Sequence, residues 1–247
     1  MNYFTPHTAA DRYSKGRPNF HNTTINHIKS YLKLENKLHS ALDIACGTGL
    51  STQALLNIAT HVYGTDGSQA MLDFALKKDK INYQIARAEV QPFANQFFDL
   101  ITVCSGVHWF DIDKFLMEAN RLLKSKSYLV LYDNFFLGEM ESNPEFLKWY
   151  NSVYLINFPA PARNDNYNWI NKKLNEMNFD YVKEEIFTNA VSFNKNELLL
   201  YFTTQSNIIS AVEKKLITYP EVEVWLDNEL SIHFANENKN ETVHFSN

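Results

Sequence analysis

Short hydrophobic runs alternate with helix-like stretches between residues 40 and 136 of the chain. Five runs have the length and composition of strands, at residues 41–45, 61–65, 83–86, 100–104 and 128–132. Hydrophobic residues recur at helical spacing at residues 51–59, 68–77 and 113–123, and Ser51 or Thr52 can cap the first helix. Because strands alternate with helices, we predict right-handed crossovers and an α/β fold with a doubly wound, mostly parallel sheet.

The pattern changes on both sides of this core. Residues 1–38 form an arm with a predicted helix near residues 24–34. The elements predicted beyond residue 137 are helices at 144–156 and 169–177, a proline-broken loop at 158–163, and strands at 181–187 and 241–245 with helical residues between them. No repeat or low-complexity linker interrupts the sequence, so we predict a single domain, residues 1–247, with helical lid insertions.

Composition and charge argue against several classes of protein, including nucleic-acid-binding, disulfide-rich and membrane proteins. Hydrophobic residues make up 45% of the chain, and the net charge of −5 with scattered lysines and arginines argues against a nucleic-acid-binding surface. The two cysteines, Cys46 and Cys104, form no CxxC motif, so we expect neither a disulfide framework nor a zinc site. The N-terminal residues lack a signal-peptide pattern, and no apolar run reaches membrane-spanning length. We therefore expect a cytoplasmic protein with no metal, nucleic-acid or membrane partner.

The strongest motif follows the first predicted strand and reads Asp43-Ile44-Ala45-Cys46-Gly47-Thr48-Gly49. Glycine has no Cβ and tolerates positive φ, so Gly47 and Gly49 allow a ligand to approach the backbone. In open α/β sheets, ligands bind outside the carboxyl ends of the strands where the strand order reverses. The first strand is the usual reversal point, and the turn therefore predicts a ligand pocket.

Two classes of ligand use such a turn. A nicotinamide dinucleotide places its pyrophosphate on the helix N-terminus and prefers a third glycine, where this chain has Thr52. Asp43 would repel a pyrophosphate, but it suits the ammonium and sulfonium groups of S-adenosylmethionine, which carries no phosphate. The electrostatics therefore favour the methyl donor over the dinucleotide.

A second acidic residue ends the second predicted strand. Asp66, in Gly64-Thr65-Asp66-Gly67-Ser68, can accept hydrogen bonds from both ribose hydroxyls of an adenosine. An aspartate in this context is also an ordinary turn residue. Because it would serve either ligand, Asp66 indicates a nucleoside and does not choose between the two.

The successive motifs resemble those of the Rossmann-like S-adenosylmethionine-dependent methyltransferases. The resemblance covers residues 43–123 and rests on the segments 42–49, 66, 88–93 and 98–101. More narrowly, Val107-His108-Trp109-Phe110-Asp111, with Tyr13 and Arg17-Pro18, resembles the trans-aconitate methyltransferase-like branch, which methylates small carboxylic acids. The resemblance implies a seven-stranded sheet with an antiparallel last strand, which residues 241–245 could supply. Within the predicted single domain, we expect an N-terminal arm (1–38), a cofactor-binding core (39–136), and a substrate-side lid with C-terminal strands (137–247).

The resemblance also implies roles for individual residues. Asp43 would organise the ammonium of the cofactor directly or through water, and Asp66 would hold its ribose. The other residues of the implied cofactor site are Tyr13 and Arg17 over the carboxylate, Ala45, Gly47, Gly49 and Gly67 in the two turns, Ala88 and Glu89 beside the adenine, and Cys104 and Ser105 near the methionine portion. Two positions depart from the family pattern, because Ala45 replaces the first glycine of the turn and Arg87 replaces an acid.

The acceptor side is less defined by the sequence. His108 is a candidate general base because histidine titrates near neutral pH; alternatively, His108 and Trp109 form pocket wall. A carboxylate acceptor is already ionised and needs no base, so transfer would then depend on alignment and desolvation. Trp149 and Arg163 are further substrate-side candidates, against the alternatives of a packed lid helix and a solvated loop arginine.

The function expected from these observations is S-adenosylmethionine-dependent methylation of a small molecule, most simply O-methylation of a carboxylate by direct displacement. The alternatives are a carrier-protein-linked acyl O-methyltransferase of the biotin-synthesis type, an NAD-dependent oxidoreductase, and a binder that kept the fold and lost the chemistry.

Overall fold

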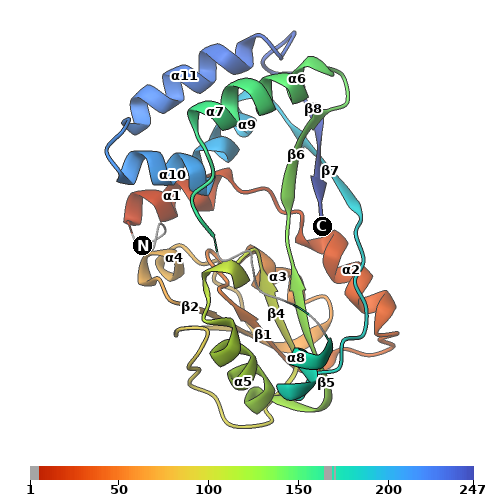
Figure 1. Ribbon diagram of the computed structural model, residues 1–247. Helices are drawn as coiled ribbons and strands as arrows, with labels where there is room; N and C mark the ends of the chain where they lie inside the picture. Colours follow the sequence, from red (N-terminus) through yellow and green to blue (C-terminus); the bar gives the residue numbers. More distant parts are fainter. Residues whose placement is uncertain (1–5, 164–168, 170) are drawn as a thin grey trace. The chain divides into compact units, whose positions relative to one another are not determined.

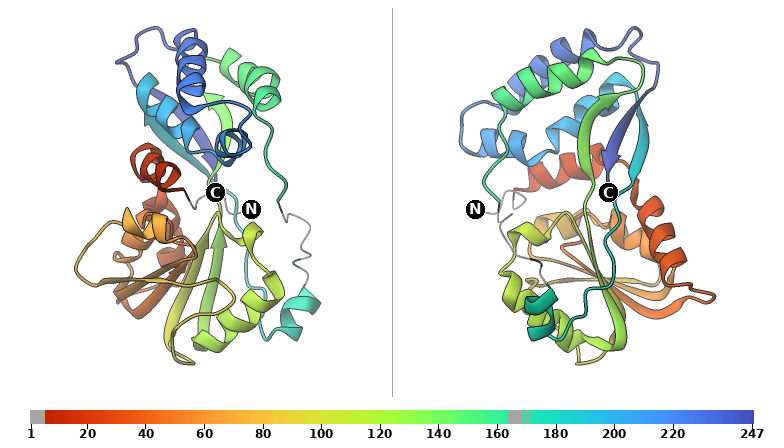
Figure 2. Two further views of the ribbon diagram at one scale, coloured as in Figure 1. Left: turned by 90° about the vertical axis from the view of Figure 1, so that its left-hand side faces the viewer. Right: turned by 45° about the vertical axis from the view of Figure 1, so that its right-hand side comes forward.

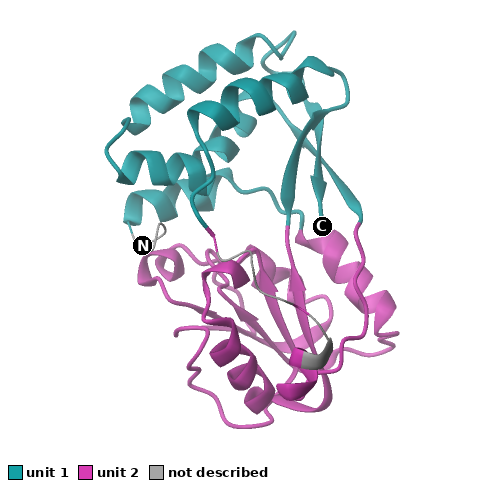
Figure 3. Ribbon diagram, in the orientation of Figure 1, with its two compact units in different colours: residues 1–20, 134–162, 187–247 teal, residues 21–133, 163–186 magenta. Residues whose placement is uncertain are grey.

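The computed structural model describes residues 6–163, 169 and 171–247 of the chain. The chain forms two compact units, each with its own hydrophobic core (Figure 3). Unit 1 comprises residues 1–20, 134–162 and 187–247, and unit 2 comprises residues 21–133 and 163–186. Both units are therefore assembled from segments that are separated in the sequence.

A five-stranded parallel sheet forms the centre of unit 2 (Figure 1). The strands are β1 (Leu38–Ile44), β2 (Ala59–Asp66), β3 (Ile81–Ile85), β4 (Phe98–Cys104) and β5 (Leu123–Tyr132). They lie in the order β3-β2-β1-β4-β5, so the strand order reverses at β1. Residues 40–44 of β1 and 100–103 of β4 are buried on both faces, as is usual in parallel sheets covered by helices. The predicted doubly wound parallel sheet is confirmed for these five strands.

Helices cover both faces of this sheet (Figure 2). The helices of unit 2 are α2 (His21–Tyr31), α3 (Leu50–Leu55), α4 (Gln69–Asp73), the 3-10 helix η1 (Val107–Trp109), α5 (Ile112–Leu122) and α8 (Asn171–Glu176). Successive strand residues point to opposite faces. Ala41 of β1 accordingly packs with α2 and α3, whereas Leu42 packs with α5. Asp111 begins α5 by accepting the backbone N–H of Lys114 at 3.4 Å.

Unit 1 contains a separate, antiparallel three-stranded sheet. Its strands are β6 (Phe135–Met140), β7 (Thr188–Phe193) and β8 (Glu241–Ser246), in the order β6-β8-β7. The helices of unit 1 are α1 (His7–Gly16), α6 (Glu145–Trp149), the π-helix η2 (Tyr150–Tyr154), α7 (Leu155–Asn157), α9 (Lys195–Thr203), α10 (Ser206–Glu213) and α11 (Tyr219–Ser231). Aromatic side chains dominate the core of the unit, with Phe136, Phe202 and Phe245 at its centre.

The predicted single seven-stranded sheet is wrong for the described residues. Residues 241–245 do form a strand, β8, but it pairs with β6 and β7 and not with the parallel sheet. The strand predicted at residues 181–187 is absent, and β7 begins at Thr188. Val182 and Ile186 are exposed there, and the segment contacts α2 through charged side chains, with Glu185 3.6 Å from His27.

The helix predicted at residues 51–59 is shorter than expected. It ends at Leu55 and β2 begins at Ala59. Neither Ser51 nor Thr52 caps it, since Gly49 occupies the N-cap position in a left-handed conformation. The two hydroxyl groups are used instead by Asp43, as described below.

No helix within residues 6–163, 169 and 171–247 combines the length and the apolar composition that a membrane crossing requires.

Candidate functional site

The predicted ligand-binding residues of the core gather at one edge of the parallel sheet. Asp66 ends β2, the turn from Ala45 to Gly49 follows β1, and Ser105 follows β4. Because the strands are parallel and ordered β2-β1-β4, their carboxyl ends lie in a row. The strand order reverses at β1 within this row, which is where ligands bind in open α/β sheets.

Asp43 lies beneath the turn and is fully buried. Its Oδ2 accepts hydrogen bonds from the hydroxyls of Ser51 at 2.6 Å and Thr52 at 2.7 Å, and its Oδ1 accepts one from Thr102 at 3.1 Å. Burial raises the pKa of the carboxyl group from 3.8 to about 6, against the effect of the three hydroxyl donors. Asp43 therefore ties the first turn of α3 to β4 from inside the protein.

Asp66 holds the glycine turn from the neighbouring strand. Its Oδ2 accepts the backbone N–H of Gly47 at 2.9 Å, and its Oδ1 accepts that of Ser68 at 2.8 Å. Burial raises the pKa of Asp66, and the two backbone donors oppose this rise. Unlike Asp43, the residue is partly exposed, so its remaining lone pairs can reach a ligand.

Gly49 is required by packing inside the protein. Its φ is +82°, and a Cβ at this position would lie 2.2 Å from Oη of Tyr83. Tyr83 comes from β3 and also packs on Gly64 of β2. Gly49 was predicted from its place in the motif to serve a ligand alone, and Tyr83, which belongs to no motif, was not predicted.

Two residues without a glycine's freedom adopt positive φ at this edge. Ala45 has a φ of +56° and Ser105 a φ of +51°. Gly106 packs against Ala45, because a Cβ on Gly106 would lie 2.9 Å from the Ala45 methyl group. The left-handed conformation costs an L-residue roughly 1–2 kcal/mol, and such strain often concentrates at functional sites. The departure of Ala45 from the family pattern is thus a strained position.

We expect Ala45→Gly to raise the free energy of unfolding by about 1 kcal/mol, because the relief of left-handed strain exceeds the flexibility cost of glycine. Urea unfolding at neutral pH measures the change. Ala54→Gly, inside α3, is the matched control and should be destabilising. If Ala45→Gly and Ala54→Gly both had a lower free energy of unfolding than the parent, the interpretation would be contradicted.

The ends of β4 and β5 carry a polar cluster that the sequence analysis identified only in part. Cys104 and Ser105 were predicted, whereas His21, Tyr132 and Asp133 were not. His21 Nδ1 lies 3.1 Å from Oη of Tyr132, and the Ser105 hydroxyl donates a short hydrogen bond to Asp133. Burial raises the pKa of the Cys104 thiol to about 12, so this cysteine is not a thiolate nucleophile at neutral pH.

The residues implied beside the adenine differ in exposure. Ala88 is buried in the core on the α5 side of the sheet. Glu89 accepts the backbone N–H of Asp111 at 3.0 Å and lies 3.4 Å from the guanidinium of Arg87. The second departure from the family pattern therefore pairs with a neighbouring acid. A Cβ on Gly67 would meet no atom within 4 Å, so open space adjoins this turn.

His108 and Trp109 lie in η1, directly after β4. Their rings are 4.6 Å apart and tilted by 59°, and Trp109 is 38% exposed. This contact matches the interpretation of the segment as pocket wall, and the role of His108 as a base stays a prediction.

Three of the other predicted residues belong to unit 1. Arg17 donates to the carbonyl of Thr204 at 3.1 Å, and its guanidinium lies 4.7 Å from the ring of Tyr13. Trp149 is buried in the aromatic core and donates its indole N–H to Glu229 at 2.6 Å. These contacts show packing within unit 1. Arg163 belongs to unit 2, at the end of the proline-broken loop.

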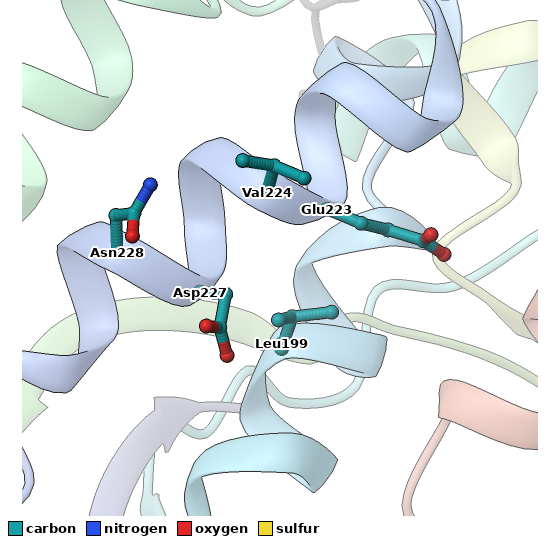
Figure 4. Close-up of a pocket in the computed structure, with 5 residues that line it drawn as sticks. All are labelled: Leu199, Glu223, Val224, Asp227 and Asn228. Carbon is teal, nitrogen blue, oxygen red and sulfur yellow. The ribbon is translucent and has the colours of Figure 1, made fainter.

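Unit 1 also has a pocket between α9 and α11 (Figure 4). It is lined by Leu199, Glu223, Val224, Asp227 and Asn228. None of the predicted site residues lines it. Asp227 is paired at 2.8 Å with Lys195, so one of its two acids already has a structural role.

Comparison with known proteins agrees with the class of fold and site. Residues 42–131 match the family model described as a methyltransferase domain. A proposed methyltransferase of Dictyostelium discoideum is 31% identical over 120 residues, which cover 49% of this chain and 45% of that protein. The ubiquinone biosynthesis O-methyltransferase of Pelagibacter ubique is 28% identical over 127 residues, or 46% of this chain and 53% of that protein. The chain thus spans about half the length of the curated relatives it matches.

A similar fold occurs in a solved structure. A proposed type II methyltransferase from Anaeromyxobacter dehalogenans superposes with a TM-score of 0.70 over 93% of this chain and 94% of that one, at 17% identity. This likeness shows the fold alone. Residues 42–131 are thus similar to a methyltransferase domain, and the parallel sheet of unit 2 lies within this matched region together with its flanking residues.

Proposed function

We propose that the chain binds S-adenosylmethionine at the carboxyl edge of the unit 2 sheet and methylates a small molecule, at a carboxylate oxygen. The observation that carries the donor assignment is the way the glycine turn is held. Gly47 donates its N–H to Asp66, and Gly49 donates its N–H to the carbonyl of Cys46 at 2.9 Å. The amides that would cradle a pyrophosphate are thus already used, and a carboxylate stands beside them.

This arrangement disfavours the NAD-dependent alternative. Asp43 beneath the turn and Asp66 beside it give the site a negative potential, which opposes a pyrophosphate and attracts a sulfonium. The residues fit an adenosine whose attached sulfonium and ammonium groups carry positive charge. Asp66 is partly exposed and keeps lone pairs that can accept from the ribose hydroxyls.

The carboxylate acceptor is proposed from the resemblance of Tyr13, Arg17 and the segment around His108 to the trans-aconitate methyltransferase-like branch. S-adenosylmethionine supplies an electrophilic methyl group. The chain then has to align a nucleophilic oxygen and exclude water from it. An ionised carboxylate has no proton to remove, so His108 serves as wall, in keeping with its tilted contact with the ring of Trp109.

Ligand binding tests the donor assignment. We expect S-adenosylhomocysteine to bind with micromolar affinity by titration calorimetry and to raise the melting temperature, while NADH does neither. Asp66→Asn should weaken S-adenosylhomocysteine at least tenfold, since a charge-assisted hydrogen bond contributes about 1.5–3 kcal/mol. Folded protein that shows no measurable binding would overturn the assignment.

The acceptor is tested in the same preparation. Incubation with S-adenosylmethionine and a panel of di- and tricarboxylates should give a methyl ester, detected by mass spectrometry as one added CH2 and removed by mild alkali. A product that resists alkali would exclude the ester and reassign the acceptor atom.

A further inference from the structure

The structure assigns the ammonium-binding carboxylate of the site to Asp133, at the end of β5, and not to Asp43. This inference rests on the proposed use of S-adenosylmethionine and names the residue that takes the primary ammonium of its methionine portion. The starting point is that Asp43, the acid implied by the resemblance, has no exposed surface. Its two oxygens already accept three hydroxyl hydrogen bonds within the protein. An ammonium group could reach it only if the turn from Asp43 to Thr52 opened.

Asp133 differs from Asp43 in its exposure to solvent. It follows Tyr132, the last residue of β5, and it is exposed. Ser105, which directly follows β4, donates its hydroxyl to Oδ1 of Asp133. The backbone N–H of Ser105 is in turn donated to the carbonyl of Tyr132 at 2.9 Å, which fixes Ser105 beside the end of β5. The left-handed φ of Ser105 is part of this arrangement.

The order of the strands matches the order of groups along the donor. Their carboxyl ends follow the row β2-β1-β4-β5, with Asp66 on β2, the glycine turn after β1, Ser105 after β4 and Asp133 after β5. Neighbouring strands lie about 4.8 Å apart, so the row from β2 to β5 is about 14 Å long. If S-adenosylmethionine binds in an extended conformation along this row, its ribose lies at Asp66 and its amino-acid end lies at β4 and β5.

The local charge favours a cation at this end of the row. Asp43 and Asp133 both raise the pKa of Cys104 by their charge, in addition to the larger effect of burial. Cys104 lies between them, as the last residue of β4. A field that opposes a thiolate at Cys104 attracts an ammonium group placed beside it. Asp43 thus contributes through space, while Asp133 is the acid that a ligand can contact.

The test compares two ligands that differ by the amino-acid end. S-adenosylhomocysteine carries the ammonium, whereas 5′-methylthioadenosine has the same nucleoside and thioether without it. We expect Asp133→Asn to weaken S-adenosylhomocysteine at least tenfold by calorimetry and to change the affinity for 5′-methylthioadenosine less than twofold. Ser105→Ala should act in the same direction with a smaller effect, and Asp133→Glu should restore part of the affinity.

Asp79→Asn is the matched control, because it removes one exposed carboxylate from a loop of the same unit. It should leave both affinities unchanged. Asp133→Asn with parental affinity for S-adenosylhomocysteine would overturn the inference, as would an equal loss for both ligands. If the parent protein binds neither ligand, the proposed function fails instead, so the two failures are distinguishable.

Discussion

The Gly49→Ala variant will be less stable than the parent by about 3 kcal/mol. Two effects add at this position. The φ of +82° costs an alanine roughly 1–2 kcal/mol, and the new methyl group would lie 2.2 Å from Oη of Tyr83. Tyr83 cannot easily move away, because its ring also packs on Gly64. Urea unfolding monitored by circular dichroism measures the loss.

A double-mutant cycle separates the two effects. Tyr83→Phe removes the nearest atom, so Gly49→Ala should be less destabilising in that background, while the cost of the φ angle remains. Gly67→Ala is the matched control, since a Cβ there meets no atom within 4 Å, and it should change stability by less than about 0.5 kcal/mol. Equal losses for Gly49→Ala and Gly67→Ala would show that the turn does not need its second glycine.

The Asp43→Asn variant will flatten the dependence of stability on pH between pH 4 and pH 7. Burial raises the pKa of Asp43 from 3.8 to about 6, so the folded protein holds this proton more tightly than the unfolded chain. The contribution of Asp43 to stability is therefore present below pH 4 and is lost as the pH rises through 6. The loss is about 3 kcal/mol, and a neutral asparagine does not undergo it.

Asparagine also fits the hydrogen bonds around the buried site. Its carbonyl oxygen can accept from Ser51 and Thr52, and its amide can face Thr102, whose hydroxyl can turn to the carbonyl of Leu42 at 3.5 Å. Unfolding free energies of parent and variant at pH 4, 5, 6 and 7 should thus diverge in favour of the variant as the pH rises. Asp79→Asn serves as the control. A constant difference between parent and Asp43→Asn across this range would contradict the raised pKa.

The parts of the site that the sequence predicted are those encoded locally. The glycine turn follows a buried strand within a few residues, and Asp66 follows the next strand in the same way. Both are visible as short motifs because a turn needs specific residues at fixed offsets. The parallel sheet was predictable for the same reason, because each strand and each crossover helix has its own spacing of hydrophobic residues in the sequence.

The missed features depend on which segments become neighbours. Asp133 faces Ser105 only because β5 lies beside β4, and Tyr83 meets Gly49 only because β3 ends the sheet next to β2. The second sheet was missed because its three strands, β6, β7 and β8, come from segments far apart in the sequence, and no strand was predicted at residues 135–140 or 188–193. Residues 181–187 have a strand-like composition, but of these only Phe187 exchanges backbone hydrogen bonds with the segment that ends β8, through Asn247.

The position of β8 sets the order in which unit 1 can form during synthesis. Residues 241–246 supply the middle strand of its sheet, with β6 on one side and β7 on the other. When the ribosome has released only the residues before 241, β6 and β7 have no strand between them and both expose unpaired backbone. The five parallel strands of unit 2 end at Tyr132 and need no later strand. In a nascent chain, the parallel sheet of unit 2 can therefore form before the central strand of unit 1 has been synthesised.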